Sequence, residues 1–337
     1  RNIGNADEAS NLQPNLNRLE DASKPESVSS VASANSLTGI FLNNSYDYQQ
    51  KYYLTASIRR DASSRFGSQK RSAAFWSLGA AWNIYREPFL QDAAVINELK
   101  IRTSYGSNGN QAIENYASLS LYSPGNDYDG KPGYVLTQYP NPYLTWEQNR
   151  PFNIGLDFAL LKNRLSGTVE YYNRTTSRLL LNVPVSSTNG ITTVFRNNGE
   201  MKNSGVEISL SSRNIIAKKE QGLSWRTDAN FSTLKNRITR LDNPITSIYK
   251  REVGTDFYQF YLAGFAGADP QTGEALWYKD ATKSATTTSY GEAQRFNQGS
   301  ALPDFYGGVT NYFSYKGFDL SFQFFYNWGN KVYDNWG

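Results

Sequence analysis

The sequence predicts an all-β fold: a transmembrane antiparallel up-and-down β-barrel with long extracellular loops, of which this chain forms a part. Three observations predict it. Apolar and polar residues alternate with a period of two in many segments. Aromatic residues are abundant, since 24 Tyr, 18 Phe and 7 Trp make up 15% of the 337 residues. Short and long connections between the alternating segments follow one another in turn, as they do in membrane barrels.

The composition excludes several classes of protein. No run of about 18 apolar residues occurs, which excludes transmembrane helices, whereas the alternating residues of a membrane strand cancel in any averaging window. The absence of Cys and His excludes thiol nucleophiles, His-based catalytic triads and structural zinc sites. A net charge of +4 without long basic runs gives no indication of nucleic-acid binding. We expect no catalytic residue, no metal site and no cofactor.

The chain divides into two predicted parts. Residues 1–36 are polar and lack periodicity, so we expect a loop or arm. Residues 37–337 form the barrel portion, with about ten strands of roughly 9–11 residues each. The clearest alternating segments are 52–59, 75–84, 99–105, 152–158, 165–171, 206–210, 223–231 and 318–324.

The alternation also predicts which side chains share a face, because successive side chains of a strand point to opposite faces. One set is apolar and is expected to face lipid: Leu54, Leu78, Ile101, Leu156, Leu210 and Leu320. The other set is polar and is expected to face the lumen: Thr55, Arg59, Arg102, Asp157 and Glu207. Tyr and Trp near the strand ends are typical of the aromatic girdles of membrane barrels.

The connections alternate in length. Tight turns are expected at 47–51, 161–164 and 315–317, and somewhat longer ones at 86–98 and 213–222. The long segments are 61–73, 107–150, 177–203 and 236–304. The tight turns therefore share one end, the periplasmic one, and the long loops share the extracellular end. A soluble β-sandwich is the alternative, but it rarely keeps its long loops at one end.

The charged residues of the strands do not indicate an enzyme. Pairs such as Asp157 with Glu170, or Glu207 with Asp228, resemble the two carboxylates of a glycosidase. They lie on polar strand faces beside Arg and Lys, however, where the charge of a barrel lumen explains them without catalysis.

The long loops carry the candidate ligand-binding residues. Aromatic rings stack on sugar rings and also grip peptides, and neighbouring amides and carboxylates bond hydroxyl groups. For each ring, packing of the loops onto one another or onto a partner is an equal alternative. The candidates are Tyr128, Tyr134, Trp146, Tyr258 and Trp277.

A series of collinear motifs resembles those of the SusC/RagA-type TonB-dependent transporters, a family of outer-membrane proteins. The resemblance covers about residues 37–335, and Ala62 stands where the family usually has Gly. The motifs are KYYLTASIRRDASSRFG at 51–67, SLGAAWNI at 77–84, LKIRTSYG at 99–106, FNIGLD at 152–157, NSGVE at 203–207, DPQTG at 269–273 and YKGFDL at 315–320.

The resemblance implies a barrel of about 22 strands around a plug, in the outer membrane of a Bacteroidota-like Gram-negative cell. It also implies energy from a TonB–ExbB–ExbD complex acting through an N-terminal region, and a SusD-like surface lipoprotein over the extracellular mouth. The plug, the TonB box and the terminal strands are not in this sequence. Ten strands would leave two unpaired edges in lipid, so we expect the native polypeptide to be at least twice as long.

The function that the resemblance implies is import of a bulky nutrient, an oligosaccharide first and an oligopeptide second. The alternative is a non-transporting structural or receptor barrel, at the cell surface or in a secretion-related assembly.

Overall fold

A computed structural model describes residues 9–10, 24–25, 33–90, 92–218 and 222–334. Most of the expected arm at 1–36 lies outside these residues; within it, β1 (Ala9–Ser10) pairs with β2 (Lys24–Pro25). The described elements are strands and short 3-10 turns, and none of the described helices is long and apolar enough to cross a membrane.

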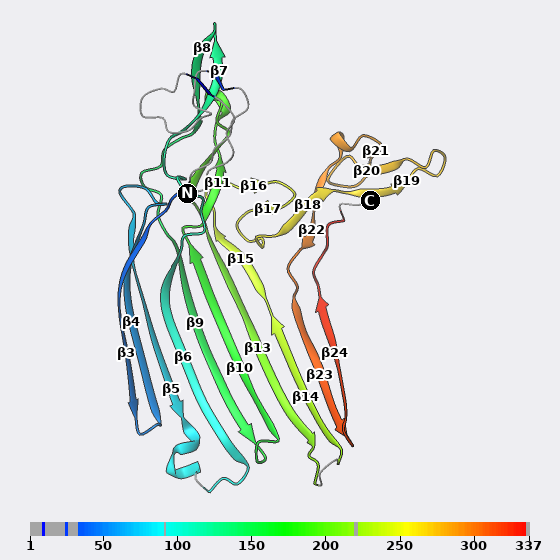
Figure 1. The fold of residues 1–337 in the computed structure, drawn as a ribbon. Helices are drawn as coiled ribbons and strands as arrows, with labels where there is room; N and C mark the ends of the chain where they lie inside the picture. Colours follow the sequence, from blue (N-terminus) through cyan, green and yellow to red (C-terminus); the bar gives the residue numbers. More distant parts are fainter. Residues whose placement is uncertain (1–8, 11–23, 26–32, 91, 219–221, 335–337) are drawn as a thin grey trace.

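One antiparallel sheet of 11 strands dominates the molecule (Figure 1). Strands that follow one another in the sheet also follow one another among the long strands of the chain, which confirms the predicted up-and-down arrangement. The strands are β3 (Leu37–Tyr48), β4 (Tyr52–Ser63), β5 (Ser72–Asn83), β6 (Ile96–Asn110), β9 (Glu147–Leu160), β10 (Leu165–Ser177), β13 (Glu200–Ile215), β14 (Ser224–Thr233), β15 (Lys235–Arg240), β23 (Phe305–Tyr315) and β24 (Phe318–Trp328).

Several strands are longer than the sequence predicts. The longest, β13, has 16 residues. Its last part pairs with β14, while its first residues pair with β15, which continues the line of β14 after Leu234. Similarly, β6 and β9 stay paired up to Asn110 and Glu147, so the ends of the expected 107–150 loop belong to the sheet. Backbone pairing therefore continues past the point where the apolar alternation ends.

The two ends of the sheet differ as the sequence predicts (Figure 1). At the lower end of the view, tight turns join β3 to β4, β9 to β10 and β23 to β24. Left-handed backbone closes the first two, at Gln49 and Gln50 and at 161–163. Lys316 and Gly317 close the third. The connection from β5 to β6, also at this end, holds two 3-10 turns, η2 (Ile84–Arg86) and η3 (Pro88–Leu90).

The long connections at the upper end contain small sheets of their own. Their strands are β7 (Leu121–Tyr128) with β8 (Lys131–Gln138), β11 (Leu180–Pro184) with β12 (Thr193–Asn197), β16 (Ile245–Thr246) with β17 (Lys250–Arg251), β18 (Gln259–Ala263) with β22 (Arg295–Ser300), and β19 (Phe265–Ala268) with β20 (Ala275–Tyr278) and β21 (Thr286–Thr287). The 3-10 turns η4 (Ser187–Asn189) and η5 (Tyr290–Glu292) lie between them.

A buried apolar cluster lies where this loop layer meets the sheet, since Phe75 belongs to β5 and the other members belong to the connections. Its members are Phe66, Phe75, Ile113, Ala117, Leu144 and Trp146. The sheet itself is open within the described residues, with β3 and β24 as its edges. The all-β antiparallel fold is thus confirmed, and the strand number of a closed barrel stays a prediction.

Candidate functional site

The strand register places the predicted apolar set on one face of the large sheet. Ile101 lies opposite Leu156, and Leu156 lies opposite Val169 of the next strand. The side chains of this face are open: Leu54, Leu78 and Leu320 are 55%, 57% and 60% exposed. A wide apolar face without a covering layer is what a strand presents to lipid.

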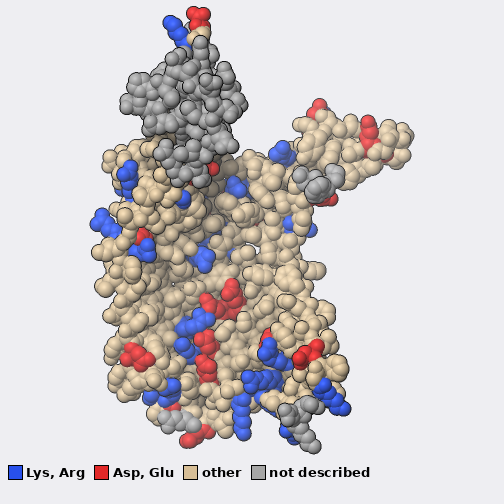
Figure 2. Space-filling model, in the orientation of Figure 1, with Lys and Arg blue, Asp and Glu red and all other residues tan. Residues whose placement is uncertain are grey.

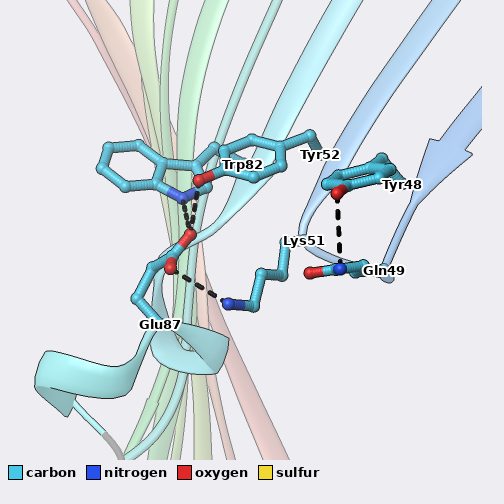
Figure 3. A network of polar contacts seen from close by, with 6 residues as sticks. All are labelled: Tyr48, Gln49, Lys51, Tyr52, Trp82 and Glu87. Carbon is cyan, nitrogen blue, oxygen red and sulfur yellow. Dashed lines mark hydrogen bonds and ion pairs between the residues drawn. The ribbon is translucent and has the colours of Figure 1, made fainter.

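Aromatic rings border this face near the tight turns. The rings of Tyr48 and Tyr52 stack with centroids 6.5 Å apart, and those of Tyr52 and Trp82 with centroids 6.3 Å apart (Figure 3). Six residues from Trp82 along β5, Trp76 meets Tyr105 edge to face at 5.5 Å. Rings at two levels, with aliphatic side chains between them, agree with the predicted girdles.

A buried carboxylate lies behind the lower rings. Glu87, 8% exposed, accepts hydrogen bonds from the Tyr52 hydroxyl at 2.7 Å and from the Trp82 indole Nε1 at 3.0 Å (Figure 3). Lys51 Nζ lies 3.1 Å from the other carboxylate oxygen. The hydrogen bond from Tyr52, then that from Trp82 and the contact with Lys51, lower the pKa of Glu87. One carboxylate thus ties the connection between β5 and β6 to β4 and β5.

The opposite face carries the charged residues. Arg102 on β6 lies between two carboxylates, with Nε 3.1 Å from Asp157 of β9 and Nη2 2.5 Å from Glu170 of β10. Glu207 lies directly opposite Glu170 on the next strand. Figure 2 shows acidic and basic side chains adjoining one another in the middle of the face turned to the viewer.

A glycine makes the second of these contacts possible. Gly155 of β9 lies between Arg102 and Glu170 in the register. A Cβ atom added at Gly155 would come 2.9 Å from the guanidinium carbon of Arg102. The missing side chain therefore leaves the path by which Arg102 crosses β9 to reach Glu170.

The structure places the predicted ligand-binding rings in different environments. Trp146 is only 4% exposed: its ring contacts Phe66 at 4.8 Å and Phe75 at 5.5 Å, and its indole donates to the carbonyl of Arg71. This position favours the loop-packing alternative for Trp146. Trp277, partly buried, contacts Phe265 and Tyr290 edge to face.

Of the three predicted tyrosines, Tyr128 and Tyr134 belong to the β7–β8 hairpin, and Tyr258 belongs to a different loop. Tyr134 of β8 is 47% exposed, and Tyr258 is 41% exposed beside Tyr249 and Phe257. Tyr128 ends β7, and its side chain lies outside the described residues. The four predicted residues whose side chains are described lie in different environments, and contact of any of the five with a ligand stays a prediction.

Two pockets open in the loop layer. One, of about 770 Å³, lies between the 139–143 segment and β12, where it meets Tyr139, Tyr143 and Arg196. The other, of about 490 Å³, lies between the β18–β22 pair and the segment that follows β24. A third pocket, of about 500 Å³, lies at the opposite end of the sheet beside Trp225 and Leu320. The described residues contain no group of three or more acidic side chains suited to a metal ion.

Sequence reasoning missed Glu87 and the pairing of Arg102 with Glu170. Glu87 lies three residues after the end of an alternating segment, and its partner Lys51 is 36 positions away. Only the strand register brings such residues together. A signal was present in the polar face itself, where a row of charges of both signs predicts ion pairs once neighbouring strands are aligned.

The chain matches known proteins along almost all of its length. Residues 3–336 match the sequence profile of the family described as TonB dependent receptor-like, beta-barrel. The chain is 31% identical to TonB-dependent receptor P39 of Formosa agariphila over 352 residues, which covers 90% of this chain and 33% of that protein. It is 30% identical to TonB-dependent receptor SusC of Bacteroides thetaiotaomicron over 327 residues, which covers 90% and 32%.

Among solved structures, the chain is similar to that of the RagAB peptide transporter. The TM-score is 0.79 at 32% identity, and the likeness covers 94% of this chain and 36% of that one. The chain thus spans about a third of the length of the relatives it matches.

Proposed function

Because this chain belongs to the TonB-dependent receptor-like β-barrel family, we propose that it forms part of the wall of an outer-membrane importer of the SusC/RagA type. The import of a bulky nutrient is its proposed activity, and an oligosaccharide is the first candidate substrate. This family is one of transporters and receptors, so the carboxylates of the polar face are assigned to the lumen and not to catalysis.

The observation that carries the proposal is the division of the sheet into two faces. Arg102 and Glu207 lie on a face that also offers hydroxyl and amide groups, whereas Leu54 and Leu78 lie on the open apolar face. A wall between lipid and an aqueous or plugged lumen needs this division on every strand. A soluble sheet would cover its apolar face with a second layer.

Three partners are part of the proposal. The apolar face contacts outer-membrane lipid. A TonB–ExbB–ExbD complex supplies energy through the N-terminal part of the whole receptor. A SusD-like lipoprotein covers the loop end, where exposed rings such as Tyr134 and Tyr143 offer contact surface. The SusC and RagAB relatives support this assignment, since both share about 30% identity with the chain over most of its length.

An oligopeptide is the second candidate substrate. Its support is the similarity to the RagAB peptide transporter, at a TM-score of 0.79. Exposed Tyr side chains at the loop end suit either substrate, because a ring face packs against a sugar as well as against a peptide. A non-transporting receptor or structural barrel is the alternative from another class.

Uptake by cells tests the proposal. Cells that carry the full receptor, and cells that lack it, are given fluorescent oligosaccharides and oligopeptides of equal size. We expect receptor-dependent accumulation of oligosaccharide that stops when the proton gradient or TonB is removed. Accumulation of peptide alone would replace the first substrate by the second. Surface binding without accumulation would establish the receptor alternative.

A further inference from the structure

The pocket beside the β18–β22 pair has an unusual lining. Two lysines, Lys283 and Lys331, lie among aromatic rings and amide side chains, and none of the lining residues is a carboxylate. The pocket joins distant parts of the chain, since Lys283 lies between β20 and β21 whereas Lys331 follows β24. The strands β18 and β22 that line it lie at the loop end of the molecule (Figure 1), where a substrate would arrive.

Lys283 is fixed by its turn and by two rings. Its backbone has a φ of +60°, a left-handed conformation that side chains other than Gly, Asn and Asp rarely adopt. Its ammonium lies 5.2 Å from the centre of the Tyr278 ring and 5.1 Å from that of Phe296. An aromatic face attracts a cation without neutralising it, so the positive charge stays available.

The acid in the same turn is occupied elsewhere. Asp280 accepts hydrogen bonds from the hydroxyls of Thr282 and Ser284 and from the backbone N–H of Ala285. These bonds, the one from Thr282 foremost, hold the pKa of Asp280 well below its usual range. Asp280 therefore closes the turn that presents Lys283 and does not pair with its ammonium.

Lys331 is positioned by backbone contacts. Its N–H donates to the carbonyl of Ser300 at 2.7 Å. Its side chain runs past Gly299, where an added Cβ would lie 3.0 Å from the Lys331 Cγ. Of the carboxylates that the structure describes, none forms an ion pair with Lys283 or Lys331.

The remaining lining suits a sugar. The ring of Phe260 is buried between those of Tyr249 and Tyr333. Tyr333 and Phe265 are 45% and 59% exposed, and their open ring faces suit the C–H side of a pyranose. The amides of Asn297 and Gln298 both donate and accept, as sugar hydroxyls do.

We propose that this pocket binds an acidic oligosaccharide, with Lys283 and Lys331 meeting its carboxylate or sulfate groups and the rings packing on its sugar faces. The inference rests on the proposed import function and narrows its substrate class. Charge-assisted hydrogen bonds to such anions are about twice as strong as neutral ones.

Calorimetry on the full receptor in detergent micelles tests the proposal, with three probes of equal length: hexagalacturonate, maltohexaose and hexaglutamate. We expect hexagalacturonate to bind tightest. Lys283→Asn removes the charge with a residue that tolerates positive φ, and Lys331→Gln removes the other. Each should weaken hexagalacturonate binding about tenfold or more, and Lys283→Arg should retain it. All variants are first compared for yield and for heat-resistant migration in gel electrophoresis, which reports an intact barrel.

The matched control is Lys279→Gln. Lys279 lies in the same connection between β20 and β21 as Lys283 and is about half exposed. It pairs with Glu292 at 2.8 Å, outside the pocket. Its loss should leave the affinity unchanged. An equal loss of affinity in this control would show that the effect comes from the net charge and not from the pocket lysines, and it would overturn the proposal. So would equal binding of maltohexaose, or binding of hexaglutamate as tight as that of hexagalacturonate.

Uptake separates this inference from the proposed function. Import of neutral oligosaccharide without binding of hexagalacturonate would overturn the acidic-ligand pocket and leave the importer standing. Lysine-dependent binding of hexagalacturonate without uptake of any probe would keep the pocket and overturn the importer.

Discussion

At the scale of single residues, Glu87 makes the stability of the turn end depend on pH. Its pKa is lowered in the folded chain, so its contribution is full above the pKa of about 4.3 of an unfolded chain. The contribution is lost as the pH falls through the lower, folded value. We expect the urea concentration at the midpoint of unfolding to decrease when the pH is lowered to less than about 4. Glu87→Gln should be less stable at neutral pH and should lack this part of the fall; identical pH profiles would contradict the prediction.

The ion pair between Arg102 and Glu170 is open to a double-mutant cycle. Both side chains are partly exposed, at 37% and 23%, so solvent weakens their attraction. We expect Arg102→Gln and Glu170→Gln to show a coupling energy of about 0.2–1 kcal/mol in unfolding experiments in micelles. Gly155→Ala, which adds a methyl group beside the guanidinium, should reduce this coupling. A coupling that Gly155→Ala leaves unchanged would show that the path over Gly155 is unimportant.

The sequence predicts the face of such residues but not their partners. Alternation alone places Arg102 and Asp157 on the polar face, and the register confirms it. The contact with Glu170 needs the register of three strands and the absence of a side chain at Gly155. The burial of Trp146 could not be predicted for the same reason, because Phe66 and Phe75 contact it from another hairpin.

At the scale of the strand, opposite faces should respond differently to the same charge. Leu54 and Thr55 are neighbours on β4 with side chains on opposite faces. Leu54→Arg should destabilise the receptor in lipid vesicles by about 1–2 kcal/mol, because it places a charge in the hydrocarbon layer close to the girdle ring of Tyr52. Thr55→Arg should cost much less, since it adds to an already charged lumen. Equal costs would contradict the assignment of the faces.

The loop layer depends on its own core. Trp146→Ala should cost about 3–5 kcal/mol in the stability of this layer, because it leaves a cavity between Phe66 and Phe75. Limited proteolysis should then cut within 61–73 and 107–150 sooner than in the unmodified receptor. Tyr143→Ala is the control, since Tyr143 is 68% exposed and outside this core. Normal protease resistance with lost ligand affinity would instead support a ligand contact for Trp146.

The strands could be predicted because every second side chain along them is apolar. The small sheets of the long loops could not, because strands such as β7 and β8 lack that period and are held by their own hairpin. The division of one long strand into β14 and β15 at Leu234 could not be predicted either, since a local irregularity leaves no mark on the average pattern.

At the scale of the whole molecule, the outer edges of β3 and β24 are unpaired within the described residues. Each presents a row of N–H and C=O groups that lipid cannot satisfy. We therefore expect these edges to pair with further strands in the full receptor. Every second amide of β3 and of β24 points outward from the sheet. Hydrogen exchange should be slow at these amides. Fast exchange there, in an intact and heat-resistant receptor, would contradict barrel closure at these strands.

The hydrogen bonds to Glu87 determine which atoms of two girdle rings are left to contact a bilayer. Tyr52 and Trp82 lie in the girdle, yet both aim their polar hydrogens at Glu87 and away from the lipid. Only their ring faces are left for the membrane interface. We therefore expect these two rings to contact the membrane interface through their faces and not through hydrogen bonds to phospholipid headgroups.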